Sequence, residues 1–399
     1  MTFKLKKINK FLICILLILL TACSNDKQVN SECQDNCEEQ IVEESPKEYK
    51  VSLFAVGDAL IHDAVYKDAK TDEIGEDGYN IYDFKKMLTE IKPLSSTHDL
   101  AFYNQETIIG GKNLGLSNYP MFNSPDEIGL DMIDAGFNIV NLATNHTVDK
   151  GVSGATYSAN FWEKQDVYTT GSYSSKEKRD NIKIAEKNGI TYAVLGYTYG
   201  TNGLPVKEGY EHLVNLWSVY GENSYEEYKE TVKEDIQKLR DKVDILIVSM
   251  HWGNEYTHSP SVYQLDAAKF LADQGVDIII GTHPHVIQPI EYIDDTLVIY
   301  SLGNFISAQE GTNRRVGMMV SLDIKKTVDN DITEISIENV KADLAWTHHV
   351  RYRNFKVIPF YNLTDEILNG YQSIYEKYKS IINPNQDSRI QVGFRWKTW

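Results

Sequence analysis

Six short apolar segments of this chain each end in a cluster of polar or charged residues, and this repeat most limits how the chain can fold. The six polar ends are, in chain order, Asp58, Glu106, His146, His251, His285 and Asn304. Amphipathic helical patterns lie between the segments, and the near-continuous apolar run at 277–281 suits a strand covered on both faces. Because strands and helices alternate along the chain, the sequence predicts an α/β fold.

The polar ends of these strands are expected to meet. In open α/β sheets the functional crevice lies outside the carboxyl ends of the strands, where the chemically capable side chains of this chain occur. Turns and helix caps explain Asp, Asn and Gly at such positions. They do not explain the repeated histidine, since the chain has only ten. A shared site is therefore the prediction.

Beyond residue 310 the pattern changes to pairs of alternating strands, followed by a helical pattern and a tail. No linker rich in Pro, Gly or Ser precedes these strands, so they are expected to complete a second sheet of the same domain. The predicted fold is a two-sheet β-sandwich flanked by helices over 50–362, with a C-terminal helix and tail over 363–399.

The sharpest local motif is His283-Pro284-His285, directly after a buried apolar run. A residue before proline favours extended geometry, and residues i and i+2 of an extended segment point to one side. Both imidazoles are therefore expected to face one space, where they could ligate one metal ion or two adjacent ions. A turn with two solvated imidazoles is the alternative.

Three further residues, Asn145, His146 and His251, have the same placement at strand ends, and each histidine alone would suit a buried structural role. Together with the histidine pair they favour a metal centre. Asp58 and Glu106 would supply the anionic oxygens that two adjacent divalent ions need. Without such a bridge the two ions would repel each other strongly.

The first 22 residues combine a basic start with the apolar run 11–20 and contain no acidic residue, which is typical of an export signal. The apolar run is about half of the ~20 residues that a spanning helix needs. The segment ends in Leu20-Thr21-Ala22-Cys23, which resembles the bacterial lipoprotein box, so Cys23 is the predicted lipidation site. A retained signal anchor is the alternative. Two or three acyl chains would anchor the protein stably at the extracytoplasmic face of the cell membrane.

Residues 23–49 are polar, acidic and without periodicity, and they are expected to form a tether. Cys33 and Cys37 lie in this segment, and either a small disulfide loop or two unpaired thiols would fit an exported chain. All four cysteines fall in the first tenth of the sequence. This distribution excludes a Cys-ligated zinc site in the folded body.

The formal net charge of −17 weighs against a nucleic-acid-binding function, because a negative field repels polyanions. The chain also lacks four common motifs: G-x-S-x-G, G-x-x-x-x-G-K-[ST], G-x-G-x-x-G and H-E-x-x-H. Their absence excludes the simplest interpretations as a serine hydrolase, a P-loop enzyme, a dinucleotide-binding enzyme or a zincin.

Taken in order, the motifs resemble those of the capsule-biosynthesis CapA family of bacterial surface proteins, part of the calcineurin-like metallophosphoesterase superfamily. The resemblance covers about residues 51–310, and it rests on GDALIH, FYNQE, NLATNH, SMHWGNE, GTHPHVIQ and YSLGNF. Relatives in this family include accessory proteins for poly-γ-glutamate capsules and for poly-glutamine cell-wall material. The resemblance implies a metallophosphoesterase-like fold and a centre for one or two divalent ions, Mn, Fe or Zn.

Carried over by position, the resemblance implies two groups of metal ligands that share Glu106 as a bridge. The first group is Asp58, Glu106 and His285, and the second is Glu106, Asn145, His251 and His283. His146 would be the catalytic general acid or the donor to a transition-state oxygen. The other residues expected in the pocket are His62, Asn104, Trp252, Glu255 and Asn304.

Two positions depart from the superfamily pattern at the first metal. The usual first motif places its histidine two residues after the Asp, whereas His62 follows Asp58 by four residues. The bridge is Glu106, which has a longer arm than the usual Asp. These departures imply one metal, an altered geometry, or a pocket that has lost phosphoesterase activity.

The leading hypothesis is an anchored accessory protein for making, exporting or retaining a poly-glutamate or poly-glutamine surface polymer, alongside a membrane synthase complex. A secreted metal-dependent phosphoesterase or polyglutamyl amidase is the alternative, and a structural binding module is a third. A neutral poly-glutamine partner suits the acidic chain more easily than polyglutamate. Polyglutamate would need the metals or a basic patch, for which Arg314-Arg315 and Lys325-Lys326 are candidates, with ordinary solvated charge as the other interpretation.

Overall fold

The structure is a computed structural model that describes residues 4–5, 45–218 and 225–393. Nearly all of the expected signal segment and most of the expected tether lie outside the described residues. The same holds for the predicted lipidation site Cys23 and for the pair Cys33 and Cys37. Within the described residues, no helix has the length and apolar character needed to cross a membrane.

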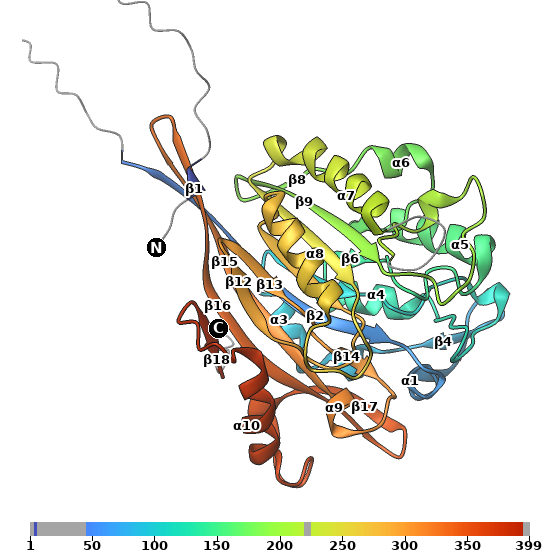
Figure 1. Ribbon diagram of the computed structural model, residues 1–399. Helices are drawn as coiled ribbons and strands as arrows, with labels where there is room; N and C mark the ends of the chain where they lie inside the picture. Colours follow the sequence, from blue (N-terminus) through green and yellow to red (C-terminus); the bar gives the residue numbers. More distant parts are fainter. Residues whose placement is uncertain (1–3, 6–44, 219–224, 394–399) are drawn as a thin grey trace, which may run out of the picture.

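Two large β-sheets form the body of the molecule (Figure 1). The first sheet has ten strands in the order β1-β16-β15-β2-β5-β6-β7, with β14 paired to β2 and with β17 and β18 paired to β16. The second has six strands in the order β12-β13-β11-β10-β9-β8. The prediction of a two-sheet α/β fold is confirmed.

The strand bounds follow sheet by sheet. The first sheet contains β1 (Lys4–Leu5), β2 (Lys47–Leu60), β5 (Leu100–Asn104), β6 (Ile139–Asn141), β7 (Tyr168–Thr170), β14 (Asn304–Ser307), β15 (Val316–Asp329), β16 (Ile332–Val350), β17 (Arg353–Pro359) and β18 (Ile390–Val392). The second contains β8 (Ala185–Lys187), β9 (Ile190–Thr198), β10 (Ile245–His251), β11 (Ile278–Thr282), β12 (Ile290–Ile293) and β13 (Thr296–Ile299). A separate hairpin pairs β3 (Lys70–Ile74) with β4 (Asn80–Tyr82).

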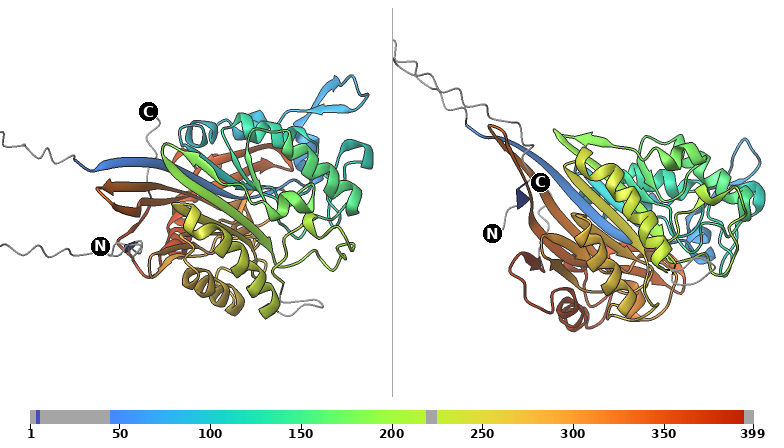
Figure 2. Two further views of the ribbon diagram at one scale, coloured as in Figure 1. Left: turned by 90° about the horizontal axis from the view of Figure 1, so that it is seen from above. Right: turned by 45° about the horizontal axis from the view of Figure 1, so that its top comes forward.

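Helices cover the outer faces of both sheets, and the views in Figure 2 show α7 and α8 together over the second sheet. The α-helices are α1 (Asp63–Ala69), α2 (Lys85–Leu88), α3 (Lys92–Ser95), α4 (Glu127–Asp134), α5 (Gly151–Glu163), α6 (Lys176–Asp180), α7 (Tyr225–Leu239), α8 (Val262–Asp273), α9 (Thr312–Arg315) and α10 (Tyr371–Ile382). Short 3-10 helices are η1 (Lys112–Leu114), η2 (Glu211–Leu213), η3 (Arg240–Lys242) and η4 (Phe360–Asn362).

Three apolar layers hold these elements together. Successive strand residues point to opposite faces, so Leu53 joins the layer between the two sheets while Phe54 joins the layer under the helices of the first sheet. On the far side, Leu246 and Val248 of β10 pack with residues of α7 and α8. The result is a helix–sheet–sheet–helix stack in which both sheets are covered on both faces.

The strands after residue 310 join a different sheet from the one expected. They extend the first sheet, because β15 pairs antiparallel with the first half of β2 and β16 pairs with β15. Strand β18 also pairs with β16, and Tyr378 and Ile382 of α10 pack into the layer between the sheets. The domain boundaries at 50 and 362 remain predictions.

The end of β2 is held very close to β14. The backbone N–H of Asp58 donates to the carbonyl oxygen of Gly303 at 3.0 Å. A Cβ atom on Gly57 would lie only 1.8 Å from that same oxygen. Glycine at position 57 therefore permits the approach that fixes where the Asp58 side chain stands.

Candidate metal centre

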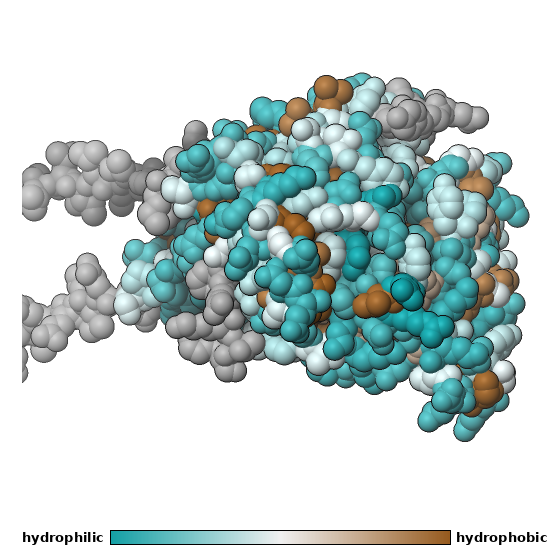
Figure 3. Space-filling view, turned by 90° about the horizontal axis from the view of Figure 1, so that it is seen from below, coloured by the Kyte–Doolittle hydropathy of each residue, from teal (hydrophilic) through white to brown (hydrophobic). Residues whose placement is uncertain are grey.

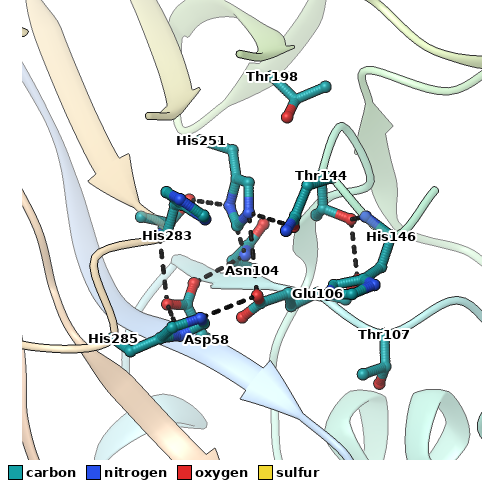
Figure 4. Close-up of polar contacts among 12 residues, drawn as sticks. Asp58, Asn104, Glu106, Thr107, Thr144, His146, Thr198, His251, His283 and His285 are labelled. Carbon is teal, nitrogen blue, oxygen red and sulfur yellow. Dashed lines mark hydrogen bonds and ion pairs between the residues drawn. The ribbon is translucent and has the colours of Figure 1, made fainter. Parts of the chain in front are cut away.

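The carboxyl ends of strands from both sheets bring acidic and imidazole side chains to one point (Figure 4). Asp58 lies in β2, Glu106 follows β5 by two residues, and His251 ends β10. His283 and His285 follow β11. All five are buried, with at most 3% of each residue exposed. Parallel pairing within each sheet places these strand ends on one side.

One group of three ligand atoms comes from Asp58, Glu106 and His285, and these atoms all lie within 4.8 Å of one another. The Nδ1 atom of His285 is 3.5 Å from Asp58 Oδ2. The Nε2 atom of the same ring is 3.5 Å from Glu106 Oε1. This is the group that the sequence resemblance assigned to a first metal.

A second group comes from Glu106, His251 and His283. His251 Nε2 is 3.9 Å from Glu106 Oε1 and 2.9 Å from Asn145 Oδ1. Glu106 thus faces both groups, as the resemblance implied. Glu255, His283 and His285 form a third group, in which Glu255 is the exposed member.

Two polar groups of the cluster are left without partners in the described part of the chain. Both carboxylate oxygens of Glu106 are buried and accept no hydrogen bond, and the same holds for Nδ1 of His283. Buried polar atoms are almost always hydrogen-bonded in native proteins, and an unpaired buried carboxylate is costly. Carboxylate oxygens and imidazole nitrogens are common ligands of divalent metals, so these residues fit a bound cation.

The electrostatics of the cluster follow from its burial. Burial raises the pKa of Glu106 well above its usual range, and the nearby Asp58 carboxylate adds to this rise. Burial lowers the pKa of both His251 and His283, which favours the neutral form of each imidazole. For His285 burial acts downward, but Glu106 and Asp58 outweigh it and raise the pKa to about 9.

Side chains that the sequence analysis did not assign as ligands hold these groups in position. Asn104 donates to Asp58 Oδ1 at 2.8 Å and accepts from Asn141 at 2.7 Å. Thr282 Oγ1 lies 2.9 Å from Nδ1 of His251. Such supporting contacts fix the orientation of metal ligands. Asn104 was expected in the pocket, whereas Asn141 and Thr282 were missed, although both also stand at strand ends.

His146 lies beside the cluster and is oriented by Asp149, a residue that the sequence analysis missed. Its Nδ1 is 2.7 Å from Asp149 Oδ2, and that oxygen also accepts from the backbone N–H of Phe122 at 2.6 Å. The Phe122 ring meets the imidazole edge-on at 4.7 Å between centroids. Because a carboxylate can only accept, Nδ1 donates and Nε2 is left for a ligand. The three-residue spacing from His146 was the only available signal.

The loop that carries the histidine pair does not have the expected extended backbone. His283 has φ of 93° and His285 has φ of 58°, both in the region that favours glycine. The two rings still face one space, with centroids 5.7 Å apart. The reason is tertiary, since the backbone N–H of His283 donates to Asp58 Oδ2 at 3.3 Å and the loop turns over the carboxylate.

The remaining expected pocket residues lie around this centre. Asn304 Oδ1 is 3.1 Å from Nδ1 of His285. Trp252 points its indole N–H to the carbonyl of Tyr300 and, with Glu255, lines an aromatic cavity of about 270 Å³ that reaches His283. His62 belongs to none of the three groups and packs edge-on against Phe122. Burial lowers the pKa of His62 to about 4.

Comparison with known proteins assigns the part of the chain that contains this centre to a protein family. Residues 52–309 match the model of a family described as bacterial capsule synthesis protein PGA_cap. The chain belongs to this family. The membership confirms the resemblance to the capsule-biosynthesis CapA family.

Three curated relatives show the range of the match. The chain is 34% identical over 207 residues to the PGA biosynthesis protein CapA of Bacillus subtilis, covering 51% of this chain and 52% of that protein. It is 29% identical over 213 residues to the capsule biosynthesis protein CapA of Bacillus anthracis, covering 51% and 49%. It is 34% identical over 84 residues, 20% of this chain and 22% of the relative, to a polyglutamine synthesis accessory protein of Mycobacterium tuberculosis. The chain thus spans about half the length of the first two.

The solved structures that match this chain are distant from it in sequence. The sulfate thiohydrolase SoxB of Thermus thermophilus matches with a TM-score of 0.41 and 12% identity, covering 82% of this chain and 61% of that one. A 5′-nucleotidase of Candida albicans matches with a TM-score of 0.38 and 11% identity, covering 70% and 48%.

Proposed function

We propose that this protein is an accessory protein in the synthesis, transport or retention of a poly-glutamate or poly-glutamine surface polymer, and that it works through a divalent-metal centre. The family and the names of the curated relatives support a role connected with such a polymer. The observation that carries the metal centre is Glu106, whose two buried oxygens accept no hydrogen bond from the described residues while His251, His283 and His285 share ligand groups with it.

In this proposal Asp58, Glu106 and His285 would hold one cation, and Glu106, Asn145, His251 and His283 would hold another. A bound divalent cation would supply a Lewis acid that polarises a carbonyl or phosphoryl oxygen. Asp58 and His285 position each other, and Asn104 keeps the Asp58 carboxylate turned toward the loop. His146, fixed by Asp149, presents Nε2 to whatever group occupies the site.

The proposal includes a lipid anchor at Cys23 on the extracytoplasmic face, and action beside a membrane synthase complex. The lipoprotein-like segment 20–23 supports the anchor. A protein anchored at Cys23 would keep its metal centre close to the membrane where a nascent polymer emerges. The anchored form also has a far higher local concentration near such a complex than a freely secreted one.

The test is complementation of a deletion strain, with surface polymer measured by antibody or by chemical assay. We expect deletion to strip the polymer and the full chain to restore it. The double variant His251→Ala with His283→Ala should fail to restore it, whereas His212→Ala, remote from the centre, should restore it fully. A deletion strain with unchanged surface polymer would refute the function.

A second candidate function is hydrolysis of an amide or phosphoester bond at the same centre. The specific observation in its favour is the His146–Asp149 pair, in which a carboxylate orients an imidazole that could exchange a proton with a reacting group. If the purified, metal-loaded chain cleaves a glutamyl polymer or a phosphodiester, and His146→Ala abolishes cleavage with metal retained, the protein is an enzyme. If His146→Ala restores surface polymer as well as the natural chain, the role is accessory only.

A further inference from the structure

A hollow of about 770 Å³ has His62 in its wall, and this imidazole is close enough to His285 of the centre to be affected by its charge. The residues that line it come from α1, from the loop after β14 and from the hairpin between β16 and β17. Those used here are His62, Asp63, Lys67, Asp68, Arg351 and Arg353. Figure 3 shows that the face seen from below is mostly hydrophilic, with only scattered apolar residues.

The acidic residues of the hollow are already satisfied. Asp63 pairs with Lys67 at 2.6 Å within α1. Asp68 accepts from the backbone N–H groups of Asn354 and Phe355 at 2.9 and 2.8 Å, which fastens the hairpin to α1. Neither carboxylate therefore needs a cation from the hairpin.

The two arginines of the hollow are left without such neutralisation. Among the described residues neither Arg351 nor Arg353 forms an ion pair, and both are exposed. A guanidinium binds carboxylates through paired hydrogen bonds. The overall charge of −17 acts only weakly here, because charges more than about 8 Å away are largely screened at physiological ionic strength. The hollow is therefore locally cationic on an acidic protein.

The basic pairs suggested by the sequence have other roles or positions. Lys325 pairs with Glu48 and Lys326 with Asp244. Arg315 lies over Trp346 and donates to the carbonyl of Thr347, so it is a structural residue. Arg314 differs, since its guanidinium lies 5.0 Å from the centre of the Tyr256 ring, and that ring is 5.9 Å from His285.

The aromatic cavity beside the metal centre has a different character. The cavity that reaches His283 is lined by tyrosines, tryptophans, amides and Glu255, and the described part of its wall contains no lysine or arginine. A chain of carboxylates would meet Glu255 there without a compensating cation. Of the two cavities, the one that reaches His283 is neutral to acidic and the one lined by His62 is cationic, so an acidic chain would favour the second.

We infer that the hollow lined by His62, Arg351 and Arg353 is a binding subsite for the carboxylates of an acidic poly-amino-acid chain that reaches the metal centre. This inference rests on the proposed function. It names polyglutamate, rather than poly-glutamine, as the ligand of the subsite. Arg314 serves as a further cationic contact at the mouth of the centre.

The test measures binding of a fluorescent γ-linked glutamate decamer to the full chain in detergent, by anisotropy at low and at physiological salt. We expect Arg351→Glu with Arg353→Glu to weaken binding tenfold or more. The matched control is Lys164→Glu with Lys242→Glu, which changes the net charge equally at exposed sites elsewhere and should stay within twofold. If the charge-reversed protein does not fold by circular dichroism, Arg351→Gln with Arg353→Gln replaces it and should weaken binding at least threefold.

The inference would be overturned if Arg351→Glu with Arg353→Glu bound the decamer as tightly as the natural chain. It would also be overturned if the control variant lost as much affinity for the decamer as this variant does. Equal affinity of the natural chain for a glutamine decamer would also overturn it, since the ligand would then not be a carboxylate. These results are independent of the proposed function, which fails only if deletion leaves the surface polymer unchanged. If the binding test failed while deletion still removed the surface polymer, only the proposed subsite would be refuted.

Discussion

At the scale of single residues, the candidate metal centre depends most on Glu106. It is the carboxylate shared by two of the three ligand groups, and its oxygens are buried without a hydrogen-bond partner in the described chain. A residue in that state destabilises the fold unless a cation neutralises it. An isosteric substitution of Glu106 removes the charge of the side chain while keeping its shape, so the two contributions can be measured separately.

We predict that Glu106→Gln reduces the bound divalent metal from near-stoichiometric to less than a tenth per chain, measured by mass spectrometry of the purified protein. The amide keeps the volume but cannot supply the bridging anion. Glu291→Gln is the matched control, because Glu291 accepts from Tyr300 far from the centre. Full metal content in Glu106→Gln would contradict the assigned role of Glu106.

At the scale of elements, the position of Asp58 depends on the contact between β2 and β14. Gly57→Ala would place a methyl group 1.8 Å from the carbonyl oxygen of Gly303, so the two strands would have to separate. We expect a loss of about 1–3 kcal/mol in the free energy of unfolding, together with weaker metal retention. Urea titration measures the first, and metal analysis the second.

Gly200→Ala is the control for that experiment. Nothing lies within 4 Å of a Cβ built at Gly200, and its backbone is not in the left-handed region. Its stability should therefore stay within about 0.5 kcal/mol of the natural chain or rise slightly. If both glycine variants behave alike, the close approach of β2 and β14 does not limit the site.

A second prediction at this scale concerns β16 and α10, which meet at Asp343. Burial raises the pKa of Asp343 to about 6, although hydrogen bonds from Leu344 N–H and Tyr375 O–H act in the opposite direction. The folded state therefore holds this proton to a higher pH than the unfolded chain does. The stability that comes from the proton is present at low pH and is lost as pH rises through about 6.

Asp343→Asn removes that titration. We predict that its free energy of unfolding, relative to the natural chain, rises by about 2 kcal/mol between pH 4.5 and pH 7.5. Urea unfolding at several pH values measures this difference. Tyr375→Phe keeps the carboxyl group and should keep the pH dependence. A constant difference for Asp343→Asn would mean that the carboxyl group titrates normally.

At the scale of the whole molecule, the candidate metal centre reaches an aromatic cavity through His283, and the expected tether would precede β2. The proposed lipid anchor decides where this assembly acts. We predict that Cys23→Ser moves the protein from the membrane fraction to the culture medium, as seen by immunoblotting. Cys14→Ser, a change within the apolar run, should leave it in the membrane fraction. Retention of Cys23→Ser at the membrane would favour an uncleaved signal anchor instead.

The sequence by itself determined the features that depend on local pattern. Apolar runs and helical periods predicted the α/β class. Polar residues at strand ends predicted that Asp58, Glu106, His251 and the histidine pair form one cluster, because parallel strands end on one side of a sheet. The resemblance of the motifs implied Glu106 as the side chain shared by two ligand groups. These signals lie within a few residues of each strand end.

Only the tertiary structure decided the features that depend on pairing between distant segments. The antiparallel pairing of β15 with β2 put the late strands in the first sheet, against the expectation. The same pairing carries the hairpin with Arg351 and Arg353 to α1, almost three hundred positions away in the chain. Likewise, the contact of His283 with Asp58 imposed a backbone that local preferences oppose. Local sequence cannot specify such contacts, because they arise from sheet register and close packing rather than from neighbouring residues.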